Sequence, residues 1–462
     1  MSKLVIRKRM WAAVPALGLA VATTFSLAGP ALPAGATVPK LYAAPNGTGT
    51  ACSKTANCSL LTAQSQALPF TTIVLAGGVY TNYNPVIAVT DLTISGPKDG
   101  SAILMKSNAS QPAPNAATPS GDPVSSLLYV GPAATRFTMQ YVTISGALAK
   151  QNPNQRFAGV YVRSSNASFN KDSIVNTYPD GGFTGIQNGT AFYVRSDNAS
   201  SSNVVFRGGS ISGYNKNGVV CADNTTTCTI DQSTVTGHGG TTVTAQNGIE
   251  IFGATGSVSR NTVQNNAYTG GTPQASGILI IDAVSGFVVT QNTVAHNDNQ
   301  IYVYDDGGTY PTTSANAQIT KNMSNNAAAY DGISLDSVTG AVVQQNKINT
   351  TGSSGGFGIG LYGATNASVV RNTIHDAFSD GIYVGGPGNL TAETSGSTFT
   401  SNKVYSSGGA GIHADTSSHN NTFSKNTTRD SDDYDVRDEG TANTWTSTHC
   451  TTHAESIPSG LC

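Results

Sequence analysis

Charged residues are scarce in this chain of 462 residues. Asp, Glu, Lys and Arg make up only 11% of it, against a usual share of about 25%. Low charge often accompanies disorder, but 38% of the residues are hydrophobic and they recur at regular spacing. The remainder is rich in Gly, Asn, Ser and Thr, a composition that suits many short strands joined by many turns.

Long apolar runs are also absent, except near the N-terminus. There a basic start from Lys3 to Arg9 precedes the apolar stretch Trp11–Ala28 and the small residues Ala34–Ala36. This order is typical of a secretory signal, so we expect cleavage after Ala36 and a secreted, extracellular protein. An uncleaved membrane anchor is the alternative. No other stretch could span a bilayer, so we expect no membrane span after cleavage.

An excess of basic residues is missing as well. Removing the signal takes away four cations and no acids, which leaves 20 basic and 26 acidic side chains and a net charge of −6. This balance argues against nucleic acid or an anionic surface as the main partner. We expect the mature chain to be a monomer.

Cysteine is limited to three close pairs. They are Cys52 with Cys58, Cys221 with Cys228, and Cys450 with Cys462. Local pairing is the simplest of the fifteen connectivities, and export favours oxidation to disulfides. A zinc site is the alternative, but no two pairs share a CxxC-type spacing.

One short pattern is abundant from about residue 158 onward: a small residue followed by apolar–x–apolar. Eleven copies lie 23 to 32 residues apart, beginning with Gly159–Val162 and ending near Val436. Such alternation indicates a short strand with one buried face. The period is too short for a crossover helix, so each repeat must wind back above the previous one. We predict an all-β fold, a right-handed parallel β-helix of about a dozen coils with two strands each.

A second pattern lies between the copies and contains an asparagine at the same place in seven repeats. These residues are Asn261, Asn292, Asn322, Asn346, Asn372, Asn402 and Asn426. Asparagine tolerates unusual backbone angles in turns. Amides stacked one coil apart can also bond to each other as a ladder. We therefore assign the column to the turns and not to catalysis.

The ends of the solenoid need caps that cover its open core. The apolar stretch Ser59–Leu68 is the only predicted helix and would cap the first coil, whereas Trp445 and the Cys450–Cys462 loop would close the last. We predict a signal peptide over 1–36, an N-terminal cap with the first strand over 37–70, the β-helix over 71–442 and a C-terminal cap over 443–462.

The run Leu41–Gly47, together with Ile73–Thr81, resembles the usual N-terminal start of the pectin-lyase-like right-handed β-helix superfamily. The closing segments Asn443–Thr446 and Pro458–Cys462 resemble the end of secreted actinobacterial-type members. The resemblance covers nearly all of the mature chain and implies the fold. It does not imply one activity, because the superfamily includes lyases, hydrolases, epimerases, transferases, adhesins and inert spacers.

Known catalytic motifs of such proteins are incomplete here. His238 lies in a Gly-His-Gly run that resembles an element of polygalacturonases, but the other elements of that family are missing. His375-Asp376 lacks the leading Asp-Pro of the alginate epimerase motif. Asn247–Glu250 matches only a fragment of the alginate lyase pattern. We interpret the two histidine runs as turn residues.

Alternation assigns two columns of outward side chains on the repeated strand. The first is Tyr161, Tyr193, Val220, Glu250, Leu279, Tyr302, Ser334, Gly360, Tyr383, His413 and Arg437; the second is Arg163, Arg195, Ala222, Phe252, Ile281, Tyr304, Asp336, Tyr362, Gly385 and Asp415. Tyrosine rings stack on sugar faces, so we predict a groove for a sugar polymer. The predicted substrate-binding residues are Tyr302, Tyr304, Tyr362, Tyr383, Glu250, Arg163 and Arg195. The alternative is that tyrosine is simply a good strand residue.

The predicted catalytic residues form two clusters on this face. Asp336, Asp305 and Asp306 could form an acid/base pair or hold Ca²⁺, and the alternative is that they are turn and surface acids. His413 and Asp415, beside Tyr383, could supply a base or form only a surface ion pair. Arg163 and Arg195 stack in one column, which indicates an anion or acid between them.

These features favour a secreted protein that binds an extracellular polysaccharide along one sheet face. It would act like a polysaccharide lyase, a glycoside hydrolase or a uronate epimerase. A non-catalytic cell-surface or adhesive protein is the alternative, because regular stacking and exposed polar residues would suffice for it. No motif requires a cofactor, and the identity of any metal is left open.

Overall fold

The chain divides into two compact units, residues 1–36 and 37–462. The structure, a computed structural model, describes residues 38–106, 114–118, 121–147, 156–177, 183–196, 200–271, 274–308, 310, 312–390, 393–451 and 456–462. The predicted signal peptide therefore lies outside the described residues. Within these ranges no helix is both long enough and apolar enough to cross a membrane.

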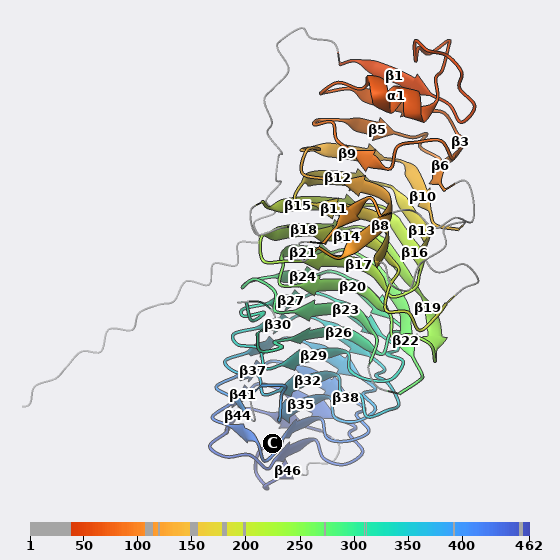
Figure 1. Cartoon of the computed structure of the whole chain (residues 1–462). Coiled ribbons are helices and arrows are strands. Elements are labelled where there is room, and N and C mark those ends of the chain that lie inside the picture. Colours follow the sequence, from red (N-terminus) through yellow and green to blue (C-terminus); the bar gives the residue numbers. More distant parts are fainter. Residues whose placement is uncertain are drawn as a thin grey trace, which may run out of the picture. The chain divides into compact units, whose positions relative to one another are not determined.

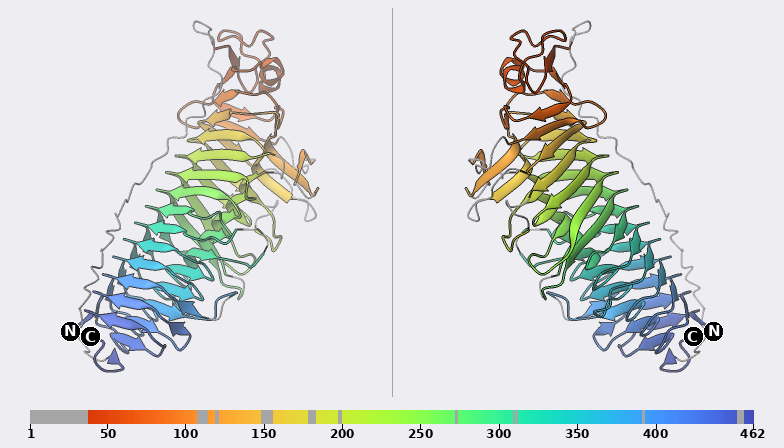
Figure 2. Two further views of the ribbon diagram at one scale, coloured as in Figure 1. Left: turned by 90° about the vertical axis from the view of Figure 1, so that its left-hand side faces the viewer. Right: turned by 90° about the vertical axis from the view of Figure 1, so that its right-hand side faces the viewer.

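Three long parallel sheets run along the second unit (Figure 1 and Figure 2). Their parallel stacks have 15, 14 and 14 strands, and we call them sheet 1, sheet 2 and sheet 3. Each turn of the chain adds one strand to each sheet, so the stack is a right-handed parallel β-helix, as predicted. Its coils are somewhat more numerous than the predicted dozen.

Sheet 1 consists of β1 (Lys40–Ala43), β2 (Thr72–Leu75), β5 (Thr93–Ser95), β9 (Phe137–Gln140), β12 (Asn166–Asn170), β15 (Ser202–Arg207), β18 (Thr226–Asp231), β21 (Thr255–Ser259), β24 (Val288–Thr290), β27 (Gln318–Thr320), β30 (Val342–Gln344), β33 (Ser368–Val370), β37 (Thr398–Thr400), β41 (Thr422–Ser424) and β44 (Thr444–Thr446). Sheet 2 consists of β3 (Gly78–Tyr80), β6 (Ala102–Met105), β10 (Val142–Ser145), β13 (Ser173–Thr177), β16 (Ser210–Tyr214), β19 (Thr234–Thr241), β22 (Thr262–Tyr268), β25 (Thr293–Ala295), β28 (Met323–Asn325), β31 (Lys347–Asn349), β34 (Thr373–His375), β38 (Lys403–Tyr405), β42 (Thr427–Arg429) and β45 (His449–Cys450).

Sheet 3 contains the repeated strand. It consists of β4 (Val86–Ile87), β8 (Pro123–Val130), β11 (Arg156–Arg163), β14 (Thr190–Arg195), β17 (Asn217–Ala222), β20 (Asn247–Phe252), β23 (Ser276–Ile281), β26 (Asn299–Tyr304), β29 (Ile333–Asp336), β32 (Ile359–Tyr362), β35 (Ile382–Gly385), β39 (Ile412–Ala414), β43 (Val436–Asp438) and β46 (Ser456–Ile457). Outside these paths β7 (Ala116–Ala117) pairs antiparallel with β8, and β36 (Thr394–Ser395) pairs with β40 (Ser418–His419).

Three strands per coil correct the prediction of two. The predicted asparagine-bearing strand is bent into two strands, such as β24 and β25, which are separated by Gln291 and Asn292. Gln291 has a positive φ of 57°, which turns the chain sharply within one residue. Because the bend costs so few residues, the apolar alternation continues across it and reads as one strand.

The asparagine ladder is confirmed. Asn292 Oδ1 accepts the backbone N–H of Asn261 at 2.9 Å and its Nδ2 at 3.0 Å, and Asn322 serves Asn292 in the same way. The pattern continues to Asn426. The left-handed backbone, however, belongs to the residue before each asparagine, as at Gln291. Each asparagine therefore contributes the hydrogen bonds of its side-chain amide. The prediction that its own backbone adopts the unusual turn angles was wrong.

The core is the interior of the coils, which is filled by buried aliphatic and aromatic side chains. At its N-terminal end lies α1 (Leu60–Gln66), the predicted helix. Ser59 Oγ accepts the N–H of Thr62 at 3.1 Å as the N-cap, and Leu60 faces the core. At the other end Trp445 stacks on Phe423 with ring centroids 3.9 Å apart.

The three local cysteine pairs are disulfides, as predicted. They join Cys52 to Cys58, Cys221 to Cys228 and Cys450 to Cys462. The first lies at the N-terminal cap and the last at the C-terminal end. The middle pair links β17 of sheet 3 to β18 of sheet 1.

Candidate functional site

Strand register places the two predicted columns on the outer face of sheet 3. Tyr302 is opposite Ser334 on the next coil, and Tyr304 is opposite Asp336. Asp336 is in turn opposite Tyr362. The same register holds from Tyr161 to Arg437. Neighbours in a column are therefore one strand spacing apart, about 4.8 Å.

A third outward column was missed. It lies three residues before the first and contains Asn217, Asn247, Ser276, Asn299, Asp331, Phe357 and Asp380. In the strand pairing, the residues that follow Asn217, Asn247 and Ser276 have no paired partner. The strand therefore bends at these positions. Asn247 consequently reaches Glu250, donating from Nδ2 to Oε2 at 2.9 Å. The sequence signal was the polar residue that precedes the small residue in most repeats.

The upstream part of the face is covered. Tyr161 and Tyr193 are 0% and 6% exposed, and their rings stack at 5.0 Å. Tyr161 donates its hydroxyl to Ala117 O at 3.3 Å, and Arg163 Nη1 donates to the same oxygen at 2.8 Å. Ala117 belongs to β7, so this short strand and its neighbouring residues lie over the predicted binding surface.

Arg195 is held by the protein itself. Its Nε and Nη2 donate to the two carboxylate oxygens of Asp223 at 2.9 and 2.6 Å. Burial lowers the pKa of Arg195, but Asp223 and Tyr193 outweigh that effect and the pKa is raised. Tyr310 donates its hydroxyl to Asp223 as well, at 2.9 Å. Asp223 follows Ala222, which is opposite Arg195 on the side away from Arg163, so this acid does not lie between the two arginines as predicted. The substrate contact of Arg195 stays a prediction.

Downstream of this cover, from Glu250 to Arg437, the face is more exposed, and the described contacts over it include Tyr310 on Phe252 and Asn389 on Asp336. Its outward side chains are mostly half-buried, and the rings of Tyr302 and Tyr304 stack at 5.1 Å. Two coils further on, Phe357 stacks on Tyr383 at 4.6 Å. Leu279 adds a half-exposed apolar side chain before Tyr302. We call this part, from β20 to β43, the open section.

Asp336 is more enclosed than predicted. Its carboxylate accepts the Tyr302 hydroxyl at 3.0 Å, Ser337 Oγ at 2.8 Å and the backbone N–H of Asn389 at 2.6 Å. Asn389 belongs to the loop that follows β35 and folds back over this coil. Asp336 points outward as the alternation predicts, but it is half-buried because a segment 53 residues away in the chain contacts it.

Asp331 lies at the start of the same coil and is only 5% exposed. Its Oδ2 accepts Ser334 Oγ at 2.6 Å and the Tyr362 hydroxyl at 2.8 Å. Gly360 makes the second bond possible, because a Cβ there would lie 2.8 Å from that hydroxyl oxygen. Burial raises the pKa of Asp331, and its hydrogen-bond donors only partly oppose this.

Asp305 and Asp306 form the turn after β26. Asp305 Oδ1 accepts the N–H of Gly307 at 2.9 Å, and the N–H of Asp306 donates to Asp282 Oδ1 at 2.9 Å. Asp282 is fully buried, and burial together with Asp306 raises its pKa to about 7. These contacts agree with the turn-residue alternative.

His413 lies between two acids. Its Nδ1 is 2.9 Å from Asp380 Oδ2, and its Nε2 is 3.2 Å from Glu439 Oε2. Burial lowers the pKa of His413, but the two carboxylates outweigh it and the pKa is raised. Both ring nitrogens are thus engaged, which leaves none to take a proton as the predicted base. Asp415 accepts the Tyr383 hydroxyl and is also bonded to Ser417.

Lys216 is a neighbour of Glu250 that the column analysis missed. It precedes β17 in a turn, and its Nζ donates to Ala245 O at 2.7 Å. Burial lowers the pKa of Lys216 and raises that of Glu250, and each charge partly offsets the effect on the other. Because the lysine is outside the strand, alternation could not place it.

Metal binding has no support from the arrangement. Across the described ranges no three His, Cys, Asp or Glu side chains are grouped so that they could hold an ion. Asp331 and Asp336 each accept three hydrogen bonds from the protein instead. The option of Ca²⁺ at this cluster therefore remains only a sequence-based expectation.

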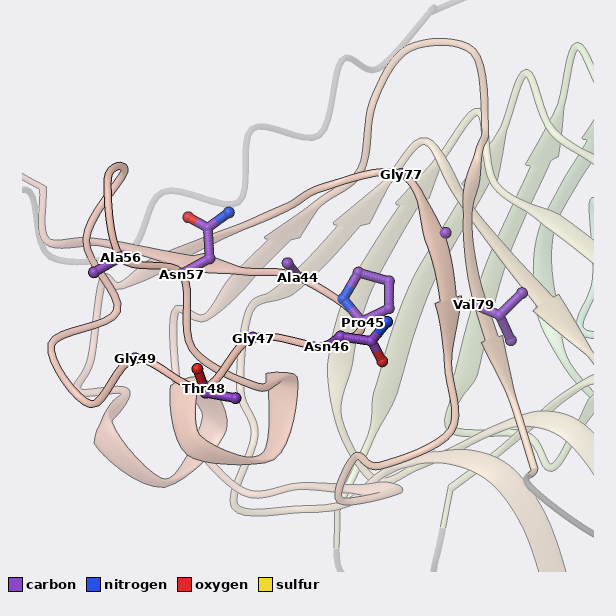
Figure 3. Close-up of a pocket in the computed structure, with 11 residues that line it drawn as sticks. Ala44, Pro45, Asn46, Gly47, Thr48, Gly49, Ala56, Asn57, Gly77 and Val79 are labelled. Atoms are coloured by element: carbon purple, nitrogen blue, oxygen red, sulfur yellow. The ribbon is translucent and has the colours of Figure 1, made fainter.

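Two hollows lie outside the open section. One of about 670 Å³ is lined by Tyr268, His296, Asp298 and Tyr330, where sheet 2 turns toward sheet 3. The other, of about 870 Å³, lies beside the N-terminal cap (Figure 3). It is lined by Ala44, Pro45, Asn46, Gly47, Thr48, Gly49, Ala56, Asn57, Gly77, Gly78 and Val79. None of these eleven side chains is ionisable, so this hollow has no acid or base for catalysis.

Residues 276–457 match the family model described as "Right handed beta helix region". Among solved structures, the chain is similar to the Dettilon tailspike protein, with a TM-score of 0.51, 17% identity and coverage of 84% of this chain. It spans 66% of that tailspike chain. A point mutant of the periplasmic alginate epimerase AlgG gives a TM-score of 0.51 at 12% identity, covering 82% of this chain and 77% of the epimerase. At these identities the likeness shows the fold alone. No curated protein matches the chain significantly.

Proposed function

We propose that this right-handed parallel β-helix protein is secreted and binds an extracellular polysaccharide along the open section of sheet 3. The observation that carries the proposal is the row of half-exposed aromatic rings beside hydroxyl and carboxylate groups, from Tyr302 to Tyr383. Aromatic rings receive the apolar faces of sugars, and the polar groups bond to sugar hydroxyls. A structural neighbour named as an alginate epimerase shows that a protein acting on a polysaccharide can have this fold.

The dimensions suit a polymer. The open section covers eight consecutive strands of sheet 3, from β20 to β43. At the usual strand spacing this is about 34 Å along the axis. Such a length accommodates several sugar units of an extended chain.

The test is the loss of binding when an aromatic ring is removed. We expect Tyr302→Ala to weaken binding to the best glycan of a panel by about fivefold, because ring stacking contributes on the order of 1 kcal/mol. Affinity electrophoresis or calorimetry would measure it. Tyr405→Ala is the matched control, because Tyr405 lies on sheet 2 under the guanidinium of Arg429. Equal affinities of the two variants would refute the assignment of this face.

Catalysis is a second candidate, favoured by the two carboxyl groups on one coil. Asp331 is buried and its pKa is raised, whereas Asp336 is a half-buried acid bonded to Tyr302. Two carboxyl groups in different surroundings are the usual division into acid and base. We therefore infer that any bond cleavage by this protein uses Asp336 together with Asp331.

The enzyme and the non-catalytic alternative are separated by product formation. The protein would be incubated with polyuronates and neutral glycans while unsaturated products and new reducing ends are measured. Asp336→Asn is expected to abolish any activity found, and circular dichroism would confirm that it folds. Retained glycan binding with neither product would favour the adhesive protein.

A further inference from the structure

We propose that the open section takes an uncharged glycan and excludes polyuronates; this inference rests on the proposed function. It follows from the signs of the charges on the three outward columns. Between the coil of β20 and that of β35 these columns contain Glu250, Asp331, Asp336 and Asp380, and no lysine or arginine. Within these three columns, the charged side chains between β20 and β35 are therefore all acids.

The acids act together on the aromatic rings. Burial raises the pKa of Tyr304 to about 12, and Glu250, Asp306, Asp282 and Asp336 all contribute in the same direction. Four acidic side chains thus lie close enough to Tyr304 to act on its hydroxyl group. A sugar carboxylate placed over this ring would meet the same repulsion.

The nearest cations are already committed. Lys216 is bonded to a backbone carbonyl, and the charge of Glu250 acts on its pKa. His413 lies between Asp380 and Glu439, and Arg437 donates to Glu439 at 2.8 Å. Upstream, Arg195 pairs with Asp223. Over the described part of this face, each of these cations thus has an internal partner, and the three that face carboxylates have part of their charge offset there.

An uncharged sugar suits the same groups. Carboxylates accept hydrogen bonds only, and sugar hydroxyls are donors. Asp336 has a half-buried side chain in register between Tyr304 and Tyr362, within reach of a ring stacked on either tyrosine. The face therefore offers apolar platforms and acceptors, which is what a neutral hexose chain requires.

The experiment compares polymers that differ in charge alone. Binding of polygalacturonate and alginate would be measured beside their carboxyl-reduced, neutral counterparts and a panel of neutral glycans, in low and high salt. We expect a neutral glycan to bind at least about tenfold more tightly than any uronate, with little dependence on salt. Tight binding of a uronate that weakens with salt would overturn the inference while leaving the proposed function intact. Binding of none would refute the proposed function.

Glu250→Gln sharpens the test. The amide keeps the size of the side chain and removes its charge, so uronate binding should strengthen severalfold relative to the unchanged protein. Asp376→Asn, at an exposed position directly after β34 of sheet 2, is the control for the same change of net charge away from the face. If Glu250→Gln binds uronates no more tightly than the unchanged protein does, repulsion by Glu250 is contradicted.

Discussion

The outer face of sheet 3 consists of two sections that have the same columns of outward side chains. They differ in how exposed those side chains are to solvent. In the upstream section Tyr161 and Tyr193 stack beneath β7 and are buried. In the open section Tyr302 and Tyr383 occupy the same column and are half-exposed. Position in a coil sets the direction of a side chain, but the segments that cross the face decide whether a ligand can reach it.

The turn ladder differs between the same two regions. In the upstream coils its place is taken by Val142, Asp172, Gly209 and Ser233, whereas every later coil from Asn261 to Asn426 has asparagine. The matched family model also begins downstream, at residue 276. A continuous asparagine ladder thus accompanies the open section, and an interrupted one accompanies the coils that carry a cover.

The largest effect is expected from breaking the ladder where it is regular. Asn346→Ala removes an amide that accepts from Asn322 and donates to Asn372 and to Ile319 O. Several buried polar groups then lose their partners, which should lower the free energy of unfolding by about 3 to 5 kcal/mol. Urea denaturation measures the change.

The control for this prediction is Asn349→Ala three residues further on. Asn349 bonds to Asn325 on sheet 2 and is half-exposed, so its loss should cost under about 1 kcal/mol. Similar losses in the two variants would show that the ladder is no stronger than a surface amide pair.

Restoring the ladder upstream should stabilise the protein. Asp172 is fully buried, and its Oδ1 accepts the N–H of Val142 at 2.8 Å, as a ladder amide would. At the equivalent place in the ladder, Asn261 donates from Nδ2 to Ile230 O. Asp172 has a carboxylate oxygen, Oδ2, in place of that amide nitrogen, and this oxygen has no hydrogen-bond partner. Burial raises the pKa of Asp172 from 3.8 to about 8. The stability contributed by this group is therefore full below about pH 4 and is lost as the pH rises through 8.

Asp172→Asn should consequently raise the free energy of unfolding by about 2 to 3 kcal/mol near pH 8 and by little near pH 4. Thermal unfolding at both pH values measures it. Asp231→Asn is the opposing control, because Asp231 bonds to Arg207 and Arg260 and its removal should destabilise. A gain for Asp172→Asn that is the same at both pH values would contradict the explanation by ionisation.

The smallest effect is expected from loosening the cover. Arg163→Ala removes the bond from Nη1 to Ala117 O, which should cost about 1 to 2 kcal/mol of stability and speed hydrogen exchange in β7. Glycan affinity should not change, because Arg163 lies outside the open section. A clear loss of affinity would show that the binding surface also includes the upstream section, and would contradict the division of the face into two sections.

The fold was predictable because period-two alternation repeats eleven times with few interruptions. The outward columns followed from the same alternation, and the register of Tyr302, Ser334 and Gly360 bears this out. The third strand of each coil was hidden because its bend is made by one residue, such as Gln291. The alternation in a strand predicts which way each side chain points. It does not reveal a bend, when the alternation continues unchanged across the bend.

The accessibility of the site could not be predicted in the same way. Ala117 covers Tyr161 from 44 residues away, and Asn389 covers Asp336 from 53 residues away. Neither contact belongs to a repeat, so no periodicity announces it. Lys216 lies in a turn, where alternation says nothing about direction.

The spacing of the ladder has a consequence for how this protein can vary. Successive asparagine rungs are separated by 31, 30, 24, 26, 30 and 24 residues, yet each makes the same pair of bonds to the next. All variation in coil length is therefore accommodated elsewhere, in the connections that flank sheet 3. Those connections include the loop that holds Asp336. Insertions and deletions can thus change the loops that border the binding face while the asparagine ladder stays the same.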